Sequence, residues 1–276
     1  METGENKNIS LGFSDLDIQN TETLHLSVEV SPNNLRYCLL DTETLKYIAF
    51  KSITTPDIVD IINREEILKN NFSSSSVSYT NFPSTIIPNS LYNSSEKKKY
   101  IDFVSEENGV IKTDQIHIND STLLYKVDEN ISNIINQIQT NIKERNSSTI
   151  SISELIKEYG KSDETNLFLI VNNKEVEIIA LKNETLIFNN TFDVQNETDI
   201  LYYTLFTYGQ LDLNPDRNQL YLLGNINKGD EKYSLLYDYI RNVKFGEVSN
   251  NLSFSQELKN VSSHQYYALF SQLLCV

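Results

Sequence analysis

Apolar and polar residues alternate along residues 24–30, and this period of two predicts a half-buried β-strand. A turn is predicted at residues 31–34, where Pro32 presets φ and two asparagines tolerate the left-handed region. Further strands are predicted at residues 35–40 and 45–53. Because the three strands follow one another closely, this part of the chain is expected to form a meander.

A second group of strand patterns begins after the middle of the chain. Apolar-rich runs at residues 167–171, 175–181 and 184–192 are separated by short polar segments at 172–174 and 182–183. Short polar segments that contain Asn are typical of hairpin turns. The pattern therefore predicts a second three-stranded meander.

Helical patterns follow the first meander. Residues 55–57 place Thr at an N-cap, Pro at the first helical position and an acid in the first turn. A strand is predicted at residues 77–87, where Pro83 indicates an edge position, a bulge or an end within the run. Asp128 is expected to cap the clearest helix of this half, because isoleucine recurs there with helical spacing.

The second meander is followed by a similar succession of elements. Helices are predicted from residue 198 or 199 to Leu211, and at residues 231–243 and 263–274. Short strands are predicted at residues 219–223 and 245–248. This half therefore has the order βββαβαβα, and the first half follows a looser version of it.

The predicted domain boundary lies after Gly160, which ends a short helix and is followed by a charged, polar segment. The chain is then divided into a flexible N-terminal segment (1–22), a first domain (23–160) and a second domain (161–276). Tandem βββαβαβα units predict an α/β protein with mixed sheets flanked by helices.

Composition excludes several classes of function. A formal net charge of −15 argues against direct nucleic-acid or anionic-membrane binding, since Lys and Arg provide most of the affinity for phosphates. The three lysines at residues 97–99 lie among acids and predict a solvated helix face. The N-terminus has no signal-peptide pattern and the apolar runs have only strand length, so a cytoplasmic protein without membrane insertion is expected.

The cysteines and histidines do not predict a metal site. Cys38 and Cys275 lie in apolar contexts that are typical of small core residues. His25, His117 and His264 are scattered, and none lies at a ligand spacing from another or from a cysteine. His264, near a predicted helix start, is interpreted either as a capping, surface or packing residue or as a functional base.

Three local stretches carry a resemblance to a known family: FPSTIIPNSLY at 82–92, QLYLLGN at 219–225 and SSHQYYALFSQLLC at 262–275. With the order of elements, they make residues 20–276 resemble an uncharacterised bacterial family, domain-of-unknown-function family 3822. The resemblance implies the actin-like ATPase fold, which is ribonuclease H-like and consists of two tandem βββαβαβα domains that clasp a nucleotide.

In that superfamily, an Asp-x-Gly-Ser/Thr turn opens each half and holds phosphate and metal. By position, the first turn falls on residues 29–32 of this chain. Glu29 could imitate the acid, although an exposed alternate strand position is the simpler interpretation. Ser31 replaces the glycine, and Pro32 removes an N–H where phosphate cradles use one.

The other two nucleotide contacts implied by the resemblance are also degraded. Asn172 and Asn173 stand where the second turn has paired glycines, and no acid precedes them. Gly224 and Asn225 stand where the adenosine motif has Gly-Gly, and a Gly that simply ends the strand is the alternative interpretation. Because all three contacts are affected, no catalytic residue, cofactor or metal is expected.

Tyrosines are abundant on the predicted helices of the second half. Tyr202, Tyr233, Tyr237 and Tyr266 are candidate interface residues, because Tyr contributes a large contact area and one hydrogen bond. The alternative is that these side chains surround a hydrophobic core.

The sequence therefore favours a catalytically inert cytoplasmic scaffold of the actin-like fold that binds an unidentified protein, similar in this respect to scaffold proteins of type II secretion and pilus assembly. The alternatives are a divergent kinase or ATPase that uses the interdomain cleft, and a small-molecule sensor. The resemblance also leaves a ribosome-assembly context open.

Overall fold

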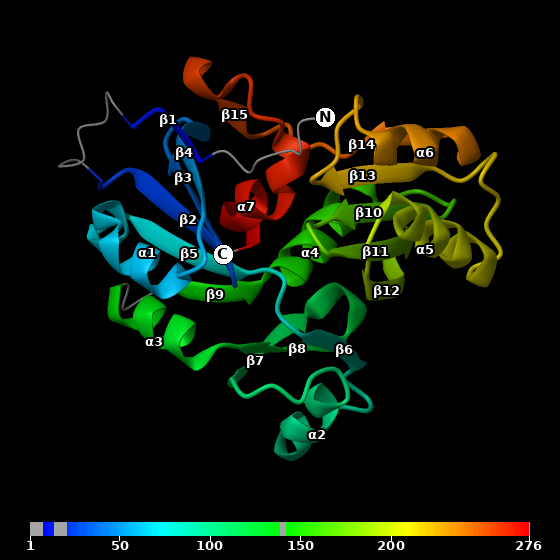
Figure 1. Cartoon of the computed structure of the whole chain (residues 1–276), viewed down its shortest axis with the longest axis horizontal. Coiled ribbons are helices and arrows are strands. Elements are labelled where there is room, and N and C mark those ends of the chain that lie inside the picture. The colour runs from blue at the N-terminus through cyan, green and yellow to red at the C-terminus, as the bar shows by residue number, and fades with distance from the viewer. Residues whose placement is uncertain (1–7, 14–20, 139–141, 276) are drawn as a thin grey trace. The chain divides into compact units, whose positions relative to one another are not determined.

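The computed structural model describes residues 8–13, 21–138 and 142–275, which form mixed β-sheets flanked by helices (Figure 1). The chain divides into two compact units. The first comprises Met1–Ile150, Asn250–Val261 and Ala268–Val276, and the second comprises Ser151–Ser249 and Ser262–Tyr267. The α/β class expected from the sequence is therefore confirmed.

The main sheet of the first unit has seven strands in the order β1-β4-β3-β2-β5-β9, with β15 paired to β4. Its strands are β1 (Ile9–Leu11), β2 (Leu24–Ser31), β3 (Asn34–Asp41), β4 (Lys46–Thr54), β5 (Ser74–Tyr79), β9 (Lys143–Asn146) and β15 (Ser253–Phe254). The predicted meander is β2-β3-β4, which is antiparallel throughout. β5 continues the sheet parallel to β2, and β9 lies parallel to β5.

A separate three-stranded sheet in the first unit has the order β6-β8-β7. Its strands are β6 (Ser84–Pro88), β7 (Val110–Ile116) and β8 (Ser121–Val127). Of the alternatives considered for residues 77–87, an end within the run is confirmed, because β5 ends at Tyr79 and β6 begins at Ser84 in a different sheet. Asn81 has a φ of 57° between them, a left-handed conformation that ends β5 and redirects the chain.

The helices of the first unit are short. They are α1 (Ile58–Arg64), η1 (Glu66–Lys69), η2 (Ser94–Glu96), α2 (Lys97–Asp102), η3 (His117–Asn119), α3 (Glu129–Ile138), η4 (Gln256–Leu258) and η6 (Gln272–Cys275). The predicted cap of α3 is confirmed, since Asp128 Oδ1 accepts from the amides of Asn130 and Ile131 at 2.8 and 3.2 Å. The cap of α1 is Asp57 rather than the predicted Thr55. None of the helices within the described ranges is long and apolar enough to cross a membrane.

The N-terminal segment was expected to be flexible through residue 22, but part of it is ordered. Residues 9–11 form β1, which pairs with β4 in antiparallel register from Ile9 opposite Ser52 to Leu11 opposite Phe50. The strand adds hydrogen bonds to an edge that β4 would otherwise expose. Residues 1–7 and 14–20 lie outside the described residues.

A buried polar network joins the C-terminal segment to the main sheet. The Gln272 side-chain amide donates to the Val28 carbonyl and to Ser78 Oγ, both at 2.8 Å. Its oxygen accepts from Ser76 Oγ at 2.7 Å, and Ser76 Oγ lies 3.0 Å from His25 Nε2. These contacts make residues 268–276 part of the first unit, so the division differs from the boundary expected at 160/161.

The second unit contains a five-stranded sheet with the order β12-β11-β10-β13-β14. The strands are β10 (Asn166–Val171), β11 (Glu175–Lys182), β12 (Thr185–Asp193), β13 (Leu220–Gly224) and β14 (Val243–Phe245). The predicted meander is β10-β11-β12, and β13 and β14 extend the sheet in parallel to β10.

One face of this sheet forms a hydrophobic core with α5 (Glu197–Gln210) and α6 (Glu231–Tyr239). Leu169, Ile178 and Leu222 of the sheet are fully buried there with Leu236 of α6. Three further elements are α4 (Ser147–Tyr159), which begins in the first unit and continues into the second, η5 (Ser263–Tyr266) and α7 (Tyr267–Ser271).

The structure also shows the surroundings of Cys38 and of the lysines at residues 97–99. Cys38 is buried in β3 as a core residue, and burial raises the pKa of its thiol. The side chain of Cys275 lies outside the described residues. The lysines of α2 lie on a solvated face, where Lys98 pairs with Asp102, and Lys99 pairs with Glu96 at 2.6 Å.

We predict that the buried His25 makes the protein sensitive to mild acid. Burial, followed by the charge of Lys143, lowers the pKa of His25 from 6.5 to about 4. Between these values the unfolded state binds the proton more tightly, so the free energy of unfolding should fall as the pH falls from 6.5 toward 4. The loss attributable to this group should be about 3 kcal/mol at most.

Urea unfolding of the wild type and His25→Asn at several pH values measures this effect. The variant should be less stable at neutral pH, but its stability should depend less on pH in this range. His117→Asn is the matched control, because His117 is exposed and its replacement should leave the pH dependence unchanged. Equal pH dependence in the wild type and His25→Asn would contradict the prediction.

Candidate functional site

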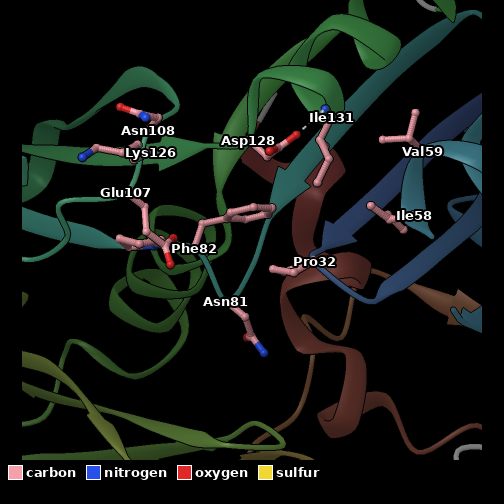
Figure 2. A pocket seen from close by; sticks show the side chains of 11 residues that line it. Pro32, Ile58, Val59, Asn81, Phe82, Glu107, Asn108, Lys126, Asp128 and Ile131 are labelled. Carbon is pink, nitrogen blue, oxygen red and sulfur yellow. Dashed lines mark hydrogen bonds between the residues drawn. The ribbon is translucent and has the colours of Figure 1, made fainter. Parts of the chain in front are cut away.

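A pocket of about 360 Å³ lies within the first unit, beside the carboxyl ends of the parallel strands β2 and β5 (Figure 2). Pro32 directly follows β2 and Asn81 follows β5, and both line the pocket. The carboxyl ends of parallel strands are the usual location of ligand sites in α/β proteins. This pocket is therefore the candidate functional site.

One side of the pocket is apolar. Pro32, the first residues of α1 and the first turn of α3 provide this side, and the ring of Phe82 points toward Ile131 in Figure 2. Ile58 and Ile131 are 6 and 3 % exposed, so they belong to the core as well as to the pocket wall. A wall of this kind suits an apolar group of a ligand.

The other side of the pocket is polar and comes from the segment around the three-stranded sheet. Glu107 and Asn108 precede β7, and Lys126 lies in β8. The ammonium group of Lys126 contacts the Ser105 carbonyl at 2.7 Å and Asp102 Oδ1 at 3.2 Å. Figure 2 shows the Lys126 side chain pointing away from the apolar side. The positive charge of Lys126 is thus held by groups of the protein itself.

The helix N-termini at this pocket are unsuited to phosphate. A helix N-terminus attracts anions through its free amides and its dipole. Here carboxylates already cap the N-termini of α1 and α3. Asp57 accepts from the Asp60 amide of α1 at 3.0 Å, and Asp128 caps α3. A neutral or positively charged ligand therefore fits this pocket better than an anionic one.

Glu29 and Ser31 stand at the position of the superfamily's first phosphate-binding turn, and both side chains are buried. Glu29 is 5 % exposed and pairs with Arg36 Nη1 at 2.6 Å across the β2-β3 hairpin. The interpretation of Glu29 as an exposed strand position is therefore wrong, because Arg36 lies opposite it and compensates its charge. Ser31 is also buried, and its hydroxyl lies 3.4 Å from Asn33 Oδ1. Pro32 is the residue of this turn that reaches the pocket.

The second unit brings Asn172, Asn173, Gly224 and Asn225 together at the carboxyl ends of β10 and β13. The Asn225 backbone amide donates to the Val171 carbonyl at 2.7 Å, and its side chain donates to Asn173 Oδ1 at 3.3 Å. The Asn172 amide closes the β10-β11 hairpin on the Glu175 carbonyl at 2.9 Å. The two loops thus meet, and their polar groups bond to one another.

Gly224 is required by the backbone at this position. Its φ is 77°, and a Cβ atom there would lie 2.3 Å from the Val171 carbonyl oxygen. Only glycine adopts this conformation and tolerates this approach without strain. Its identity is therefore explained by the packing of β13 against β10.

His264 has a packing role in this arrangement. Its Nε2 donates to the Ile226 carbonyl at 2.8 Å, and its ring lies 4.4 Å from the ring of Phe245. Burial lowers the pKa of His264. The interpretation as a packing residue thus accounts for its contacts.

Sequence reasoning did not single out Glu175, the first residue of β11. Burial, followed by the charges of Glu177 and Asp193, raises its pKa from 4.5 to about 7. Asp193 lies directly opposite Glu175 in the sheet, and like charges in this position repel. The alternation along β11 did not reveal this pair, because it depends on the register with β12.

The candidate interface tyrosines differ in exposure. Tyr202 and Tyr237 are 59 and 56 % exposed, whereas Tyr233 and Tyr266 are half-buried. Tyr233 stacks on Phe245 with 5.6 Å between ring centroids, so it also belongs to the edge of the core. Within the described residues, no group of three or more His, Cys, Asp or Glu side chains is placed to hold a metal ion.

Comparison with known proteins places the chain in a family. A family model described as "Protein of unknown function (DUF3822)" matches residues 14–243. The match covers most of the chain, and the chain therefore belongs to this family, as its sequence motifs indicated. No curated protein matches it.

Several solved structures have a similar fold. A Bacteroides thetaiotaomicron protein with an actin-like ATPase fold and unknown function has a TM-score of 0.75 and 15% identity, over 92% of this chain and 98% of its own. The PilM-PilN type IV pilus biogenesis complex contains a chain with a TM-score of 0.59 and 10% identity, over 91% of this chain and 98% of its own. At these identities the likeness establishes the fold alone.

We predict that Gly224→Ala destabilises the protein by about 2–3 kcal/mol, because it adds a Cβ atom to a left-handed residue in contact with the backbone. Gly209→Ala is the matched control. Gly209 lies in α5, and a Cβ atom added there would meet nothing within 4 Å, so this change should stabilise the helix by about 0.5–1 kcal/mol. Denaturant unfolding measures both effects, and equal stabilities of the two variants would contradict the packing role of Gly224.

We predict that Glu175→Gln stabilises the protein at alkaline pH. The folded-state pKa lies above the ordinary value, so the wild type loses stability as the pH rises from 4.5 through about 7. The variant removes this loss and should be more stable by about 1–3 kcal/mol at pH ~8, with a smaller difference at pH ~5. Glu164→Gln, at an exposed position, should change neither value. Thermal unfolding at the two pH values decides the outcome, and a pH-independent difference would argue against the raised pKa.

Proposed function

We propose that this chain is a catalytically inert protein of the actin-like fold that acts as a cytoplasmic scaffold by binding another protein. In this proposal the two units correspond to the two tandem βββαβαβα domains of the superfamily. The pocket at the ends of β2 and β5 takes an extended segment of the partner, with an apolar side chain against Ile58, Val59 and Phe82.

The composition of the pocket carries this proposal. Its apolar side is continuous with the core, and the charge of Lys126 is compensated by Asp102 and the Ser105 carbonyl. Carboxylates stand at the starts of the helices that border it, which opposes a triphosphate. A volume of about 360 Å³ also suits a few side chains of a peptide.

The charge of the chain supports the same type of partner. A net charge of −15 and the carboxylates of Glu107 and Asp128 at the pocket favour a neutral or basic segment. One chain of the PilM-PilN type IV pilus biogenesis complex has a similar fold, and it belongs to a protein complex. This likeness supports a binding role without naming the partner.

Nucleotide binding is the second candidate function. The loops that hold Asn173, Gly224 and Asn225 meet at the carboxyl ends of parallel strands, where the superfamily binds adenosine. Against it, the Asn225 and Asn173 side chains bond to each other, and Pro32 has no N–H to offer a phosphate.

We predict that Val59→Arg abolishes partner binding while the fold is retained. Val59 is half-buried at the pocket, and a guanidinium group there would fill the apolar side. Ile118→Arg is the matched control, since Ile118 is 49 % exposed in η3 and does not line the pocket. Affinity capture from native lysate should recover a protein with the wild type and Ile118→Arg but not with Val59→Arg.

Nucleotide binding is tested separately with the same samples. The unfolding temperature should be the same with and without Mg–ATP, Mg–ADP or Mg–GTP. A bound ligand at about 100 times its Kd would instead add about 2.7 kcal/mol to the free energy of unfolding.

In the capture experiment, recovery of the same proteins by Val59→Arg, or of none by any variant, would contradict the proposed binding role. In the unfolding experiment, a higher unfolding temperature with any nucleotide would contradict the proposal that the protein is catalytically inert.

A further inference from the structure

The outer edge of β12 is open. β12 is the end strand of the five-stranded sheet, and no other strand pairs with this edge among the described residues (Figure 1). Most of its residues are exposed or half-buried, and Ile187 is 43 % exposed. An open strand edge offers unpaired backbone groups to another strand.

β12 has little of the protection that edge strands usually carry. Natural edges are protected by Lys, Pro, short length or a bulge. β12 has a register shift near Ile187, but the stretch from Phe188 to Asp193 continues in regular register with β11. This stretch, FNNTFD, contains no Lys, Arg or Pro, and its single charge is Asp193 at the end. In a chain with a net charge of −15, such a stretch is unusually suited to pairing.

We propose that β12 pairs with β12 of a second copy of this chain and forms a symmetric dimer. In antiparallel pairing around Asn190, Phe188 of each copy lies opposite Phe192 of the other, and Asn190 lies opposite itself. Phe188, Asn190 and Phe192 share the sheet face of Ala180, Ile178 and Val176, their partners in β11. Aromatic pairs directly opposite one another stabilise a sheet, so the strand is complementary to itself.

Charge does not oppose this pairing. Asp193 of one copy lies about 20 Å from Asp193 of the other along the strands, at ~3.4 Å per residue. That distance is larger than the Debye length of about 8 Å at physiological ionic strength. Glu175 lies opposite Asp193 in the same copy, so it is also remote from Glu175 of the other copy.

An exposed aromatic surface continues from this edge onto α5. Tyr203 stacks on Phe192 with 4.4 Å between ring centroids, and Tyr202 contacts Tyr203 at 5.2 Å. Tyr202 also stacks on Phe206 at 6.0 Å, and these two side chains are 59 and 46 % exposed. A two-fold axis perpendicular to the sheet places both copies of α5 on the same face. The aromatic surfaces of the two copies would then extend the contact made by the strands.

The first test is the molar mass of the purified full-length chain, measured by light scattering over a range of concentrations. We expect a dimer whose Kd rises about tenfold or more in Asn190→Lys, because this change places like charges directly opposite one another. Thr185→Lys adds the same charge to the same strand but lies outside the paired stretch, so its dimer should persist. Thermal unfolding checks that both variants fold.

The second test locates the axis by cross-linking. In the proposed register, the Cα atoms of the two Asn190 residues lie about 4.5–5.5 Å apart, within the range of a disulfide. Asn190→Cys should therefore form a covalent dimer on mild oxidation. Thr185→Cys should not, because its two copies lie about 34 Å apart along the strands. A monomer at all concentrations, or a dimer that neither Asn190→Lys weakens nor Asn190→Cys cross-links, would overturn the proposal.

Discussion

The side-chain amide of Gln272 is the contact on which the main sheet of the first unit depends. It bonds to the Val28 carbonyl of β2 and to Ser76 and Ser78 of β5, the two strands whose ends carry the pocket. Since Ser76 Oγ donates to Gln272, it accepts from His25 Nε2, and His25 Nδ1 in turn accepts from Ser74 Oγ at 2.7 Å. This order of donors requires neutral His25 and fits its low pKa. A residue near the C-terminus thus completes the buried polar groups of a parallel strand pair.

A second buried network holds the three-stranded sheet, from which the polar side of the pocket comes, to the main sheet. Asp114 of β7 accepts from the Asn146 amide at 2.6 Å and from Thr149 Oγ1 at 2.8 Å. Burial raises the pKa of Asp114, and these hydrogen bonds partly offset that effect. Glu144 of β9 pairs with Lys112 Nζ of β7 at 2.5 Å. Partly desolvated groups of this kind are costly to separate, which keeps the two sides of the pocket in place.

Elements defined by local sequence patterns could be predicted, whereas elements that depend on contacts between residues distant in sequence could not. The meanders and the Asp128 cap are encoded by alternation and by single residues, so local reasoning finds them. β5 has the polar sequence SSSVSY and becomes a buried strand only because His25 and Gln272 satisfy its serines. The N-terminal β1 and the C-terminal η6 join the main sheet through contacts distant in sequence. The pocket was missed for the same reason, since residues from five separate segments form it, although its Pro32 was recognised as a barrier to phosphate.

The loops at the carboxyl ends of β10 and β13, and the β2-β3 turn, are held by contacts within the chain. Gly224 still permits the close approach of β13 to β10, because the sheet itself requires it. The polar groups around it are engaged within the protein, since Asn225 bonds to Val171 and Asn173. In the first unit, Glu29 is likewise neutralised by Arg36. Internal hydrogen bonds and an ion pair therefore hold these strand ends in place within the chain itself. The apolar pocket and the open edge of β12 are the surfaces that we propose for recognition.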